Sequence, residues 1–403
     1  MTVEARPNPV DDRKFTAPLA RALARHSGAV AGTLSGKTAW RTASRWVYAT
    51  VLIAWAEDHG LIPARLRAEA ELARKEHVRE GGTLADWVRD GIKDLAVHPA
   101  TGCLSDDRYL PMDHAPAEPA LQALTDWWSA DAPDFAYPVD KGPASITGWL
   151  CGDLLQEQQD EQRKAAALCQ TPWWVADFLC ERTLVPALAA FPNERLIRVI
   201  DPACGSGHIL TWIMIGLYQW YRHGVPQLEP TAALRRVLAG LHGVELDPLT
   251  AAVARLRLTV VAGSLLAADG ALPTPMRLHH IPAWVRPRIA VGNALLAGLD
   301  DPHPPGTILD DTALYPGILQ RGTYHAVIAN PPYKVVKDKT VKEAIRAAYP
   351  TAVGNYPLSV PFTELLFDLA IRGGTVSGPE QLDLFGDAPA SASTPNPTRR
   401  SST

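Results

Sequence analysis

The sequence lacks the features that mark a secreted, membrane-spanning or metal-binding protein. Charged residues occupy the N-terminus, where a signal peptide would have its apolar core. The longest apolar stretches, around residues 47–56 and 260–268, are too short to span a bilayer. The five cysteines form an odd set without a C-x-x-C pair, which is typical of a reducing cytoplasm and not of a zinc site or a disulfide framework. We therefore expect a cytoplasmic protein that binds no metal and enters no membrane.

Two enzyme motifs and one charge pattern are also missing. There is no G-x-x-x-x-G-K-[ST] phosphate loop, and no Glu-x-Lys triplet of the kind that a nuclease would need. The formal net charge of −4 argues against a uniformly basic surface for nucleic acid, although it leaves room for a local basic face. The function must therefore be sought in local motifs.

Composition and helix signals divide the chain into regions. Its 403 residues, 47% of them apolar, are enough for two or three domains with sizeable cores. Helical patterns over residues 40–60 and 65–80 indicate a mainly α-helical first part, and residues 99–147, rich in Pro, Asp and Gly, indicate a connector with short elements. The expected divisions are a flexible N-terminus (1–15), a mainly helical N-terminal domain (16–150), a second domain (151–376) and a disordered tail (377–403).

From residue 196 onward, short strand patterns alternate with helical ones. Strands are expected over residues 196–200, 241–247, 288–296 and 324–330, with helical segments between them. Such alternation favours an α/β fold in which helices cover both faces of a parallel sheet. In this architecture ligands bind at the carboxyl ends of the strands.

The seven residues "DPACGSG" (201–207) lie between the first of these strands and the following helix. Gly205 and Gly207 have no side chain to obstruct a ligand, and the start of the helix adds unpaired N–H groups. The third glycine of a dinucleotide-binding loop is missing, because Leu210 occupies its position. Asp201 favours a ligand with an amine or hydroxyls over a pyrophosphate. A tight turn without a ligand is the alternative interpretation.

Two further polar residues end the next strands. Glu245, in "GVELDP", can accept hydrogen bonds from both hydroxyls of a ribose, although a carboxylate here could also be a helix cap. Asn293, in "VGNALL", can bind the edge of an adenine. Three such residues at successive strand ends indicate a ligand more strongly than any one of them.

The fourth strand ends in "NPPY" (330–333). Two adjacent prolines remove two backbone donors and fix two φ angles, so the sheet ladder cannot continue. The segment holds the Asn330 amide and the Tyr333 ring at a fixed separation and leaves carbonyl oxygens free to accept hydrogen bonds. In isolation it would be interpreted as a proline-rich turn.

Taken together, these four motifs resemble the S-adenosylmethionine-dependent DNA methyltransferases that methylate amines, in particular the adenine-N6 branch. Upstream, "QTPWWVADFL" (170–179) resembles that family's additional cofactor motif. The segments "GDLLQEQQ" (152–159) and "NYPLSVPFTELLFDLA" (355–370) resemble the large methyltransferases of the phage-resistance systems called BREX or Pgl. The resemblance covers residues 150–374.

The resemblance implies a Rossmann-like class I methyltransferase domain, incomplete at its C-terminal side and preceded by the mainly helical domain. It implies S-adenosylmethionine as cofactor, double-stranded DNA as partner and the N6 amine of a flipped-out adenine as methyl acceptor, in phage defence or restriction-modification. The implied cofactor-binding residues are Thr171, Asp201, Pro202, Ala203, Cys204, Gly205, Gly207, Glu245 and Asn293. The implied catalytic residues are Asn330, Pro331, Pro332 and Tyr333.

The "NPPY" segment suits an adenine amine, which is a poor nucleophile because its lone pair is delocalised into the ring. Two acceptors aimed at its N–H bonds favour a pyramidal nitrogen, and the Asn330 side-chain oxygen and the Pro331 carbonyl can be those acceptors. Moving the base out of the duplex costs a few kcal/mol. Stacking on Tyr333 offsets this by roughly 1–3 kcal/mol.

A basic run follows this segment. It would face DNA phosphates if Tyr333 faces the base, and a solvated charged helix explains it equally well. Its lysines are Lys334, Lys337, Lys339 and Lys342.

Other methyltransferase classes fit less well. Cytosine-C5 enzymes need a Pro-Cys nucleophile, and no Pro-Cys dipeptide occurs. Cytosine-N4 enzymes also methylate an amine and stay open as an alternative. Protein-glutamine methyltransferases share the "NPPY" segment, because a side-chain amide is also planar, but they lack the "TPWWVADFL" element.

A non-enzymatic alternative is a cofactor-binding remnant or subunit. The resembled enzymes continue past "NPPY" with further strands and a recognition domain, whereas this sequence offers only "GGTVSG" (373–378) as an outer neighbour for the strand at 324–330. We therefore expect that strand to be poorly covered. A second polypeptide would then supply the remaining strands and the recognition domain.

Overall fold

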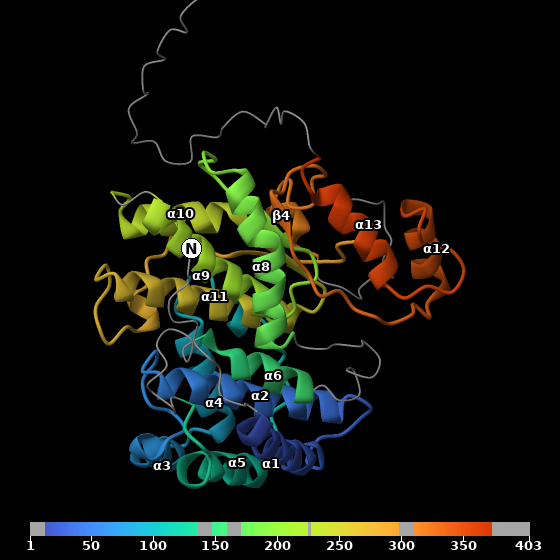
Figure 1. The fold of residues 1–403 in the computed structure, drawn as a ribbon. Helices are drawn as coiled ribbons and strands as arrows, with labels where there is room; N and C mark the ends of the chain where they lie inside the picture. Colours follow the sequence, from blue (N-terminus) through green and yellow to red (C-terminus); the bar gives the residue numbers. More distant parts are fainter. Residues whose placement is uncertain (1–12, 136–146, 159–170, 225–226, 298–309, 373–403) are drawn as a thin grey trace, which may run out of the picture. The chain divides into compact units, whose positions relative to one another are not determined.

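The described part of the chain lies between residues 13 and 372 of a computed structural model (Figure 1). The described residues are 13–135, 147–158, 171–224, 227–297 and 310–372. The tail expected over residues 377–403 lies outside them. So does the N-terminus expected to be flexible, except for residues 13–15, which begin the first helix.

The first part of the chain is helical, as expected. Its described elements are α1 (Arg13–Ala31), α2 (Ala39–Asp58), η1 (Ala68–Ala70), α3 (Glu71–Arg79), α4 (Leu84–Leu95), η2 (Gly102–Ser105), α5 (Glu118–Ala130) and α6 (Trp149–Gln158). Helix α2 is apolar on nearly all sides and forms the centre of this part, with Trp46 and Trp55 almost fully buried.

Two expectations for this part were wrong in detail. The helix expected over residues 65–80 begins only at Glu71, after an irregular stretch and the short turn η1. The connector expected over residues 99–147 contains α5, a helix of 13 residues. Leu121, Leu124 and Trp128 of α5 lie at helical spacing and are buried, so this apolar stripe outweighs the local Pro and Asp content.

The second part contains the expected parallel sheet. Its strands are β1 (Val199–Asp201), β2 (Leu241–Glu245), β3 (Arg288–Val291) and β4 (Ala326–Val327). They are shorter than expected, and they form one sheet in the order β3-β2-β1-β4 with every pair parallel. The chain moves outward from β1 to β3 and then returns to the other side of β1, which makes the gap between β1 and β4 a topological switch point.

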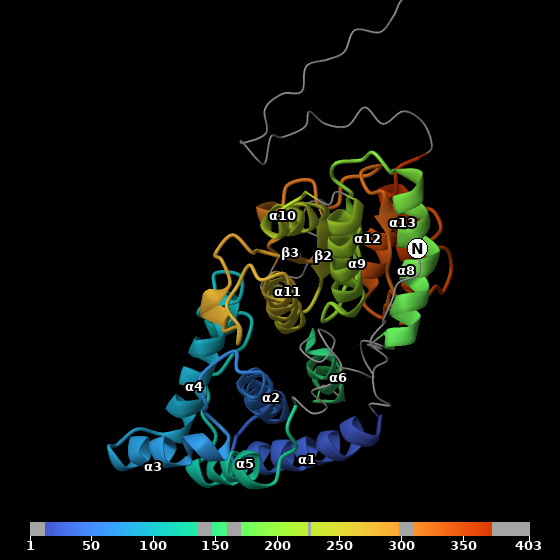
Figure 2. The ribbon, with the colours of Figure 1, turned by 60° about the vertical axis from the view of Figure 1, so that its left-hand side comes forward.

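Helices cover both faces of this sheet, so the α/β prediction is confirmed. The helical elements of this part are α8 (Trp173–Ala190), α9 (His208–Gly224), α10 (Pro230–Gly240), α11 (Pro248–Ala268), η4 (Leu278–His280), η5 (Thr312–Leu314), α12 (Lys339–Ala348) and α13 (Ser359–Leu369). Neighbouring strand residues alternate between the two faces: Val199 packs into the core with α9 and α11, and Ile200 into the core with α12 and α13. Helices α12 and α13 lie side by side in both views (Figures 1 and 2).

The outer side of β4 has the beginning of a neighbour. Tyr324 forms an isolated parallel bridge with Ala370, and the Ile371 N–H donates to the Tyr324 carbonyl at 2.9 Å. This contact comes directly after α13 and directly before residues 373–378, the segment expected to lie beside this strand, which is outside the described residues.

Helix α11 has the length and composition of a membrane span. The apolar run counted from the sequence covers only residues 260–268 of this helix and is therefore too short to span a bilayer. In the structure 83% of its most apolar window is buried inside the protein. Its two arginines, Arg255 and Arg257, are also buried and hydrogen-bonded. Helix α11 is therefore a core helix of the described fold.

A buried ion pair of the second part contacts both β3 and, through Tyr109, the helical part. Arg255 Nη2 lies 2.7 Å from Asp311 Oδ2, with both side chains less than a tenth exposed. The Asp311 carboxylate also accepts hydrogen bonds from the Val291 N–H at the end of β3 and from the Tyr109 hydroxyl of the helical part. Removing one partner of such a pair leaves an uncompensated buried charge.

We predict that Asp311→Ala lowers the free energy of unfolding by about 3–5 kcal/mol, because Arg255 is then left buried without its carboxylate. Urea unfolding of the wild type and the variant measures this difference. The control is Asp90→Ala, which removes the exposed Lys93–Asp90 pair and should change the free energy of unfolding by less than about 1 kcal/mol. Equal effects of the two substitutions would contradict the prediction.

Candidate active site

The predicted site residues gather around the switch point of the sheet. Asp201 ends β1, Glu245 ends β2, and Asn330 follows β4 by three residues. Because β1 pairs in parallel with both β2 and β4, these three strand ends lie at the same edge of the sheet. The region where ligands bind in doubly wound folds is therefore lined by residues from three of the four motifs.

The glycine loop, defined here as residues 201–207, has a backbone that only glycine adopts easily at two points. Gly205 and Gly207 have φ angles of +55° and +83°. A side chain added at Gly205 would meet no atom within 4 Å, so this face of the loop is open, whereas one at Gly207 would press on Ala254 of α11 at 3.3 Å. The loop can therefore present its backbone to a ligand on the Gly205 side.

The remaining loop residues shape this turn from inside. Pro202 is buried, Ala203 is half-buried, and Cys204 is 6% exposed. The Cys204 N–H donates to the Val244 carbonyl of β2 at 3.0 Å, which holds the loop against the neighbouring strand. Burial raises the pKa of the Cys204 thiol well above its usual value, so this cysteine is unsuited to act as a nucleophile.

Two carboxyl groups are buried beside the loop. Glu245 Oε2 accepts a hydrogen bond from the Gly205 N–H at 3.0 Å, Glu245 Oε1 accepts one from the Asp247 N–H at 2.8 Å, and Asp201 Oδ1 accepts one from the Ala203 N–H at 3.0 Å. Burial raises the pKa of Asp201 to about 8, with a further contribution from the charge of Glu245. Burial also raises the pKa of Glu245 to about 7, whereas the hydrogen bonds from the backbone N–H groups of Asp247 and Gly205 oppose the rise.

Asn293 lies at the same edge, just beyond β3. Its side-chain oxygen accepts the Leu295 N–H at 3.1 Å and so stabilises the turn that leaves the strand. The preceding residue, Gly292, donates its N–H to the Glu245 carbonyl at 2.9 Å, which joins this turn to the end of β2. The structure thus brings Asn293 next to the Glu245 strand end, with its side chain half-buried.

The "NPPY" segment and the upstream motif meet through their side chains. Asn330 Nδ2 donates to the Thr171 hydroxyl at 3.2 Å, although the two residues are 159 positions apart. The Tyr333 hydroxyl donates to Asn330 Oδ1 at 3.1 Å, and the Tyr333 side chain is 62% exposed. These bonds fix the amide so that its nitrogen faces the start of α8 and its oxygen faces the exposed ring. Pro331 and Pro332, both half-buried, separate the two side chains.

The lysines of the basic run differ in exposure. Lys337 and Lys339 are exposed, whereas Lys342 is half-buried and places its ammonium 5.9 Å from the Tyr356 ring centre. Burial lowers the pKa of Lys334, and the charge of Glu245 opposes this shift, so the Lys334 ammonium interacts with the Glu245 carboxylate.

Sequence reasoning missed a group of buried residues behind the glycine loop. Arg257 of α11 donates to the Ser206 carbonyl and hydroxyl at 2.5 and 3.1 Å, and Ser206 in turn bonds His208 at 3.1 Å. Arginines within the apolar run of α11 were the available signal, because a charge there requires buried partners.

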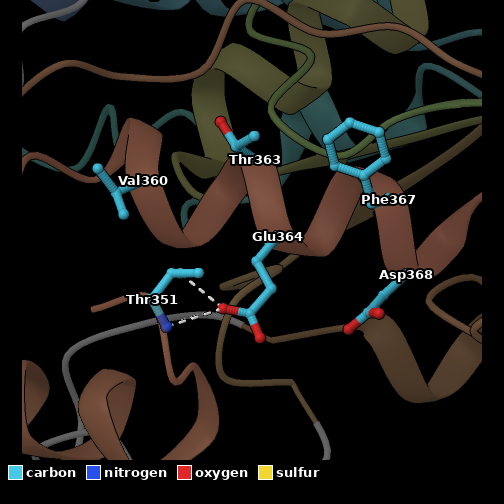
Figure 3. Close-up of a pocket in the computed structure, with 6 residues that line it drawn as sticks. All are labelled: Thr351, Val360, Thr363, Glu364, Phe367 and Asp368. Carbon is cyan, nitrogen blue, oxygen red and sulfur yellow. Dashed lines mark hydrogen bonds between the residues drawn. The ribbon is translucent and has the colours of Figure 1, made fainter. Parts of the chain in front are cut away.

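One surface depression lies apart from these residues. It has a volume of about 490 Å³ and lies along the outer face of α13, where the Glu364 carboxylate accepts hydrogen bonds from Thr351 (Figure 3). Its lining residues are Thr351, Val360, Thr363, Glu364, Phe367 and Asp368. None of the predicted site residues contributes to it.

Comparison with known proteins agrees with the motifs. Residues 240–378 match the family described as Eco57I restriction-modification methylase. The chain is also 31% identical over 368 residues to the adenine-specific methyltransferase PglX of Streptomyces coelicolor. This chain resembles the adenine-specific restriction-modification methyltransferases. The resemblance predicted from the motifs is thereby confirmed. The match covers 82% of this chain and 30% of the length of its relative.

Three solved structures also match this chain, each with a TM-score below 0.5. The Type IIL restriction-modification enzyme MmeI in complex with DNA is 15% identical over 72% of this chain and 41% of that chain, with a TM-score of 0.34. A DrdV–DNA complex is 13% identical over 88% of this chain and 33% of that chain, with a TM-score of 0.41. The methyltransferase subunit of a type I restriction-modification system from Streptococcus thermophilus is 14% identical over 88% of this chain and 71% of that chain, with a TM-score of 0.39. At these scores the strand order given above, rather than the neighbours, defines the fold.

The buried carboxyls predict an unusual dependence of stability on pH. An unfolded Asp has a pKa of about 3.9, so between that value and a folded pKa of about 8 the folded chain holds a proton on Asp201 that the unfolded chain has released. Stability from this group is therefore full at low pH and falls as the pH rises to 8, by up to about 1.4 kcal/mol per pH unit.

We predict that Asp201→Asn, which keeps an acceptor for the Ala203 N–H, makes the protein without added ligand more stable than the wild type at pH 9. The substitution should also flatten the slope of stability between pH 6 and 8. Urea unfolding at each pH measures this. The exposed Asp310→Asn serves as control and should leave the slope as it is in the wild type. A wild-type slope that Asp201→Asn does not change would contradict the raised pKa.

Proposed function

We propose that this chain binds S-adenosylmethionine at the switch point and transfers its methyl group to the N6 amine of an adenine flipped out of DNA, in restriction-modification or phage defence. The observation that carries the proposal is the meeting of four motifs at one sheet edge, with Thr171 bonded to Asn330 there. The similarity to adenine-specific methyltransferases supports it.

The residues at this edge fit the parts of S-adenosylmethionine. Asp201 and Glu245 are buried carboxyls that receive backbone N–H groups and keep further acceptor sites, which suits an ammonium group and ribose hydroxyls. The open side of Gly205 leaves room for close approach. Thr171 would meet the carboxylate and Asn293 the adenine. Bound there, S-adenosylmethionine supplies an electrophilic methyl group.

The "NPPY" segment would hold the base that receives the methyl group. Asn330 Oδ1 and the Pro331 carbonyl would accept the two N–H bonds of the adenine amine, which concentrates the nitrogen lone pair on the reacting side. The Tyr333 hydroxyl occupies Asn330 Oδ1 in this structure, so an incoming amine would replace it as donor. The exposed ring of Tyr333 is then available for stacking on the base.

Lys337 and Lys339 are the lysines of the basic run best placed to meet DNA phosphates, because both are exposed. Lys334 fits the cofactor side better, since its surroundings include Glu245. Recognition of a DNA sequence, a cytoplasmic location and the need for a second polypeptide stay predictions. The chain spans 30% of the length of PglX. A methylation assay with the chain alone tests the need for a second polypeptide.

The first test of this function is cofactor binding. We expect calorimetry to show S-adenosylmethionine binding to the wild type and a loss of at least about tenfold in affinity for Glu245→Ala, because two charge-assisted hydrogen bonds are worth more than 1.4 kcal/mol. Glu194→Ala, which changes an exposed carboxylate on the loop before β1, is the control and should bind like the wild type. Equal affinity of Glu245→Ala would remove Glu245 from the site.

The second test is the product. We expect mass spectrometry of nucleosides from DNA treated with this chain, together with whatever polypeptide completes the enzyme, to show N6-methyladenine and no N4-methylcytosine. Asn330→Ala should lower the rate at least about 100-fold, because one acceptor of the amine is lost, while its affinity for S-adenosylmethionine stays within a few-fold of the wild type. N4-methylcytosine as the product, or full activity of Asn330→Ala, would contradict the assignment of the segment.

A further inference from the structure

The back of the glycine loop is built by residues outside the four motifs at the strand ends. Arg257 of α11 is fully buried, and its guanidinium donates to the Ser206 carbonyl at 2.5 Å, to the Ser206 hydroxyl at 3.1 Å and to the Thr147 carbonyl at 2.8 Å. The Ser206 carbonyl belongs to the peptide unit that leads into Gly207, where φ is +83°. Arg257 therefore holds the part of the loop backbone whose conformation is least favourable for an ordinary residue.

Helix α6 closes the same region from the other side. Gly152 lies so close to the loop that an added Cβ would fall 2.3 Å from Ser206 Oγ and 2.4 Å from a ring carbon of His208. The Trp149 ring contacts the His208 ring edge-on, with centroids 4.0 Å apart. Helix α6 thus reaches the loop through the one residue type that permits this approach.

The contacts continue into the N-terminal helical part. The Tyr48 hydroxyl of α2 donates to the Cys151 carbonyl of α6 at 2.8 Å, and both residues are buried. A continuous set of buried contacts therefore runs from α2 through α6 to the loop and on to α11. Among the residues that the structure describes, Arg257 Nη2 has no hydrogen-bond partner, and His208 Nε2 lies 3.6 Å from Asp153 Oδ1 of α6.

We propose that Arg257 and Gly152 are positioning residues that fix the backbone of the glycine loop in its cofactor-binding shape, and that α6 thereby makes the helical part a component of the cofactor site. The inference rests on the proposed binding of S-adenosylmethionine. Neither residue is placed to touch the cofactor, since both act through Ser206 and the loop backbone. Their effect should appear in cofactor affinity and not only in stability.

The test uses two pairs of variants of the full chain, with affinity for S-adenosylmethionine measured by calorimetry well below the unfolding temperature of each protein. Arg257→Met removes the hydrogen bonds to the loop. Its matched control is Arg74→Met, which removes another buried arginine that donates to Thr125 and Asp126 in the helical part. We expect a loss on the order of tenfold in affinity for Arg257→Met and less than about twofold for Arg74→Met.

The second pair adds a methyl group without removing a charge. Gly152→Ala pushes against Ser206 and His208, whereas Gly28→Ala in α1 has its nearest outside contact at an ordinary 3.8 Å. Both changes favour helix locally. We expect Gly152→Ala to weaken cofactor binding on the order of tenfold and Gly28→Ala to leave it unchanged. Arg257→Lys, which keeps the charge and one donor to Ser206, should recover part of the affinity.

The outcomes separate the two proposals. If the wild type binds S-adenosylmethionine and the variants at Arg257 and Gly152 bind as tightly as their controls, the positioning role is wrong although the proposed function stands. If the wild type does not bind the cofactor, the proposed function is overturned, and this inference with it. Weakened binding in Gly152→Ala alone still supports the role if Arg257→Met does not fold.

Discussion

β1 is hydrogen-bonded on both edges, to β2 over the three residues Val199–Asp201 and to β4 over Val199 and Ile200. All of its residues are buried, so it cannot change register without moving both neighbours. The ends of β1 and β4 are thereby held side by side, and Asp201 and Asn330 reach the same edge of the sheet. In the proposed function, this pairing would set the separation between the methyl group of the cofactor and the base that receives it.

The same edge contains a conflict between stability and binding. Asp201 and Glu245 are buried with raised pKa values, a condition that opposes their ionised forms. Groups of this kind cluster at functional sites. A ligand that supplies a positive charge or hydroxyl donors stabilises the ionised carboxyl groups, which burial destabilises in the protein alone. The buried Arg255–Asp311 pair one strand away shows the contrasting case, where the protein itself supplies the partner.

The helical part and the sheet part are joined by polar contacts as well as apolar ones. Tyr109 bonds the Asp311 carboxylate near β3, and the Leu278 N–H bonds the Leu61 carbonyl. Both parts also contribute to one cluster of buried apolar residues. Through α6, the helical part reaches the back of the glycine loop at Gly152. Under the proposed positioning role, a change within the helices would alter the loop through α6.

The sequence alone determined the order of strands and helices and the residues at the strand ends, because apolar runs, glycines and prolines act locally. Parallel pairing then placed Asp201, Glu245 and Asn330 together without further information. Only the tertiary structure decided that Thr171 bonds Asn330 and that Arg257 holds the loop, since these contacts span 159 and 51 positions. The periodicity of a sequence indicates which face of a helix or strand a side chain occupies. It does not indicate which distant residue that side chain contacts, because this depends on how separate elements pack.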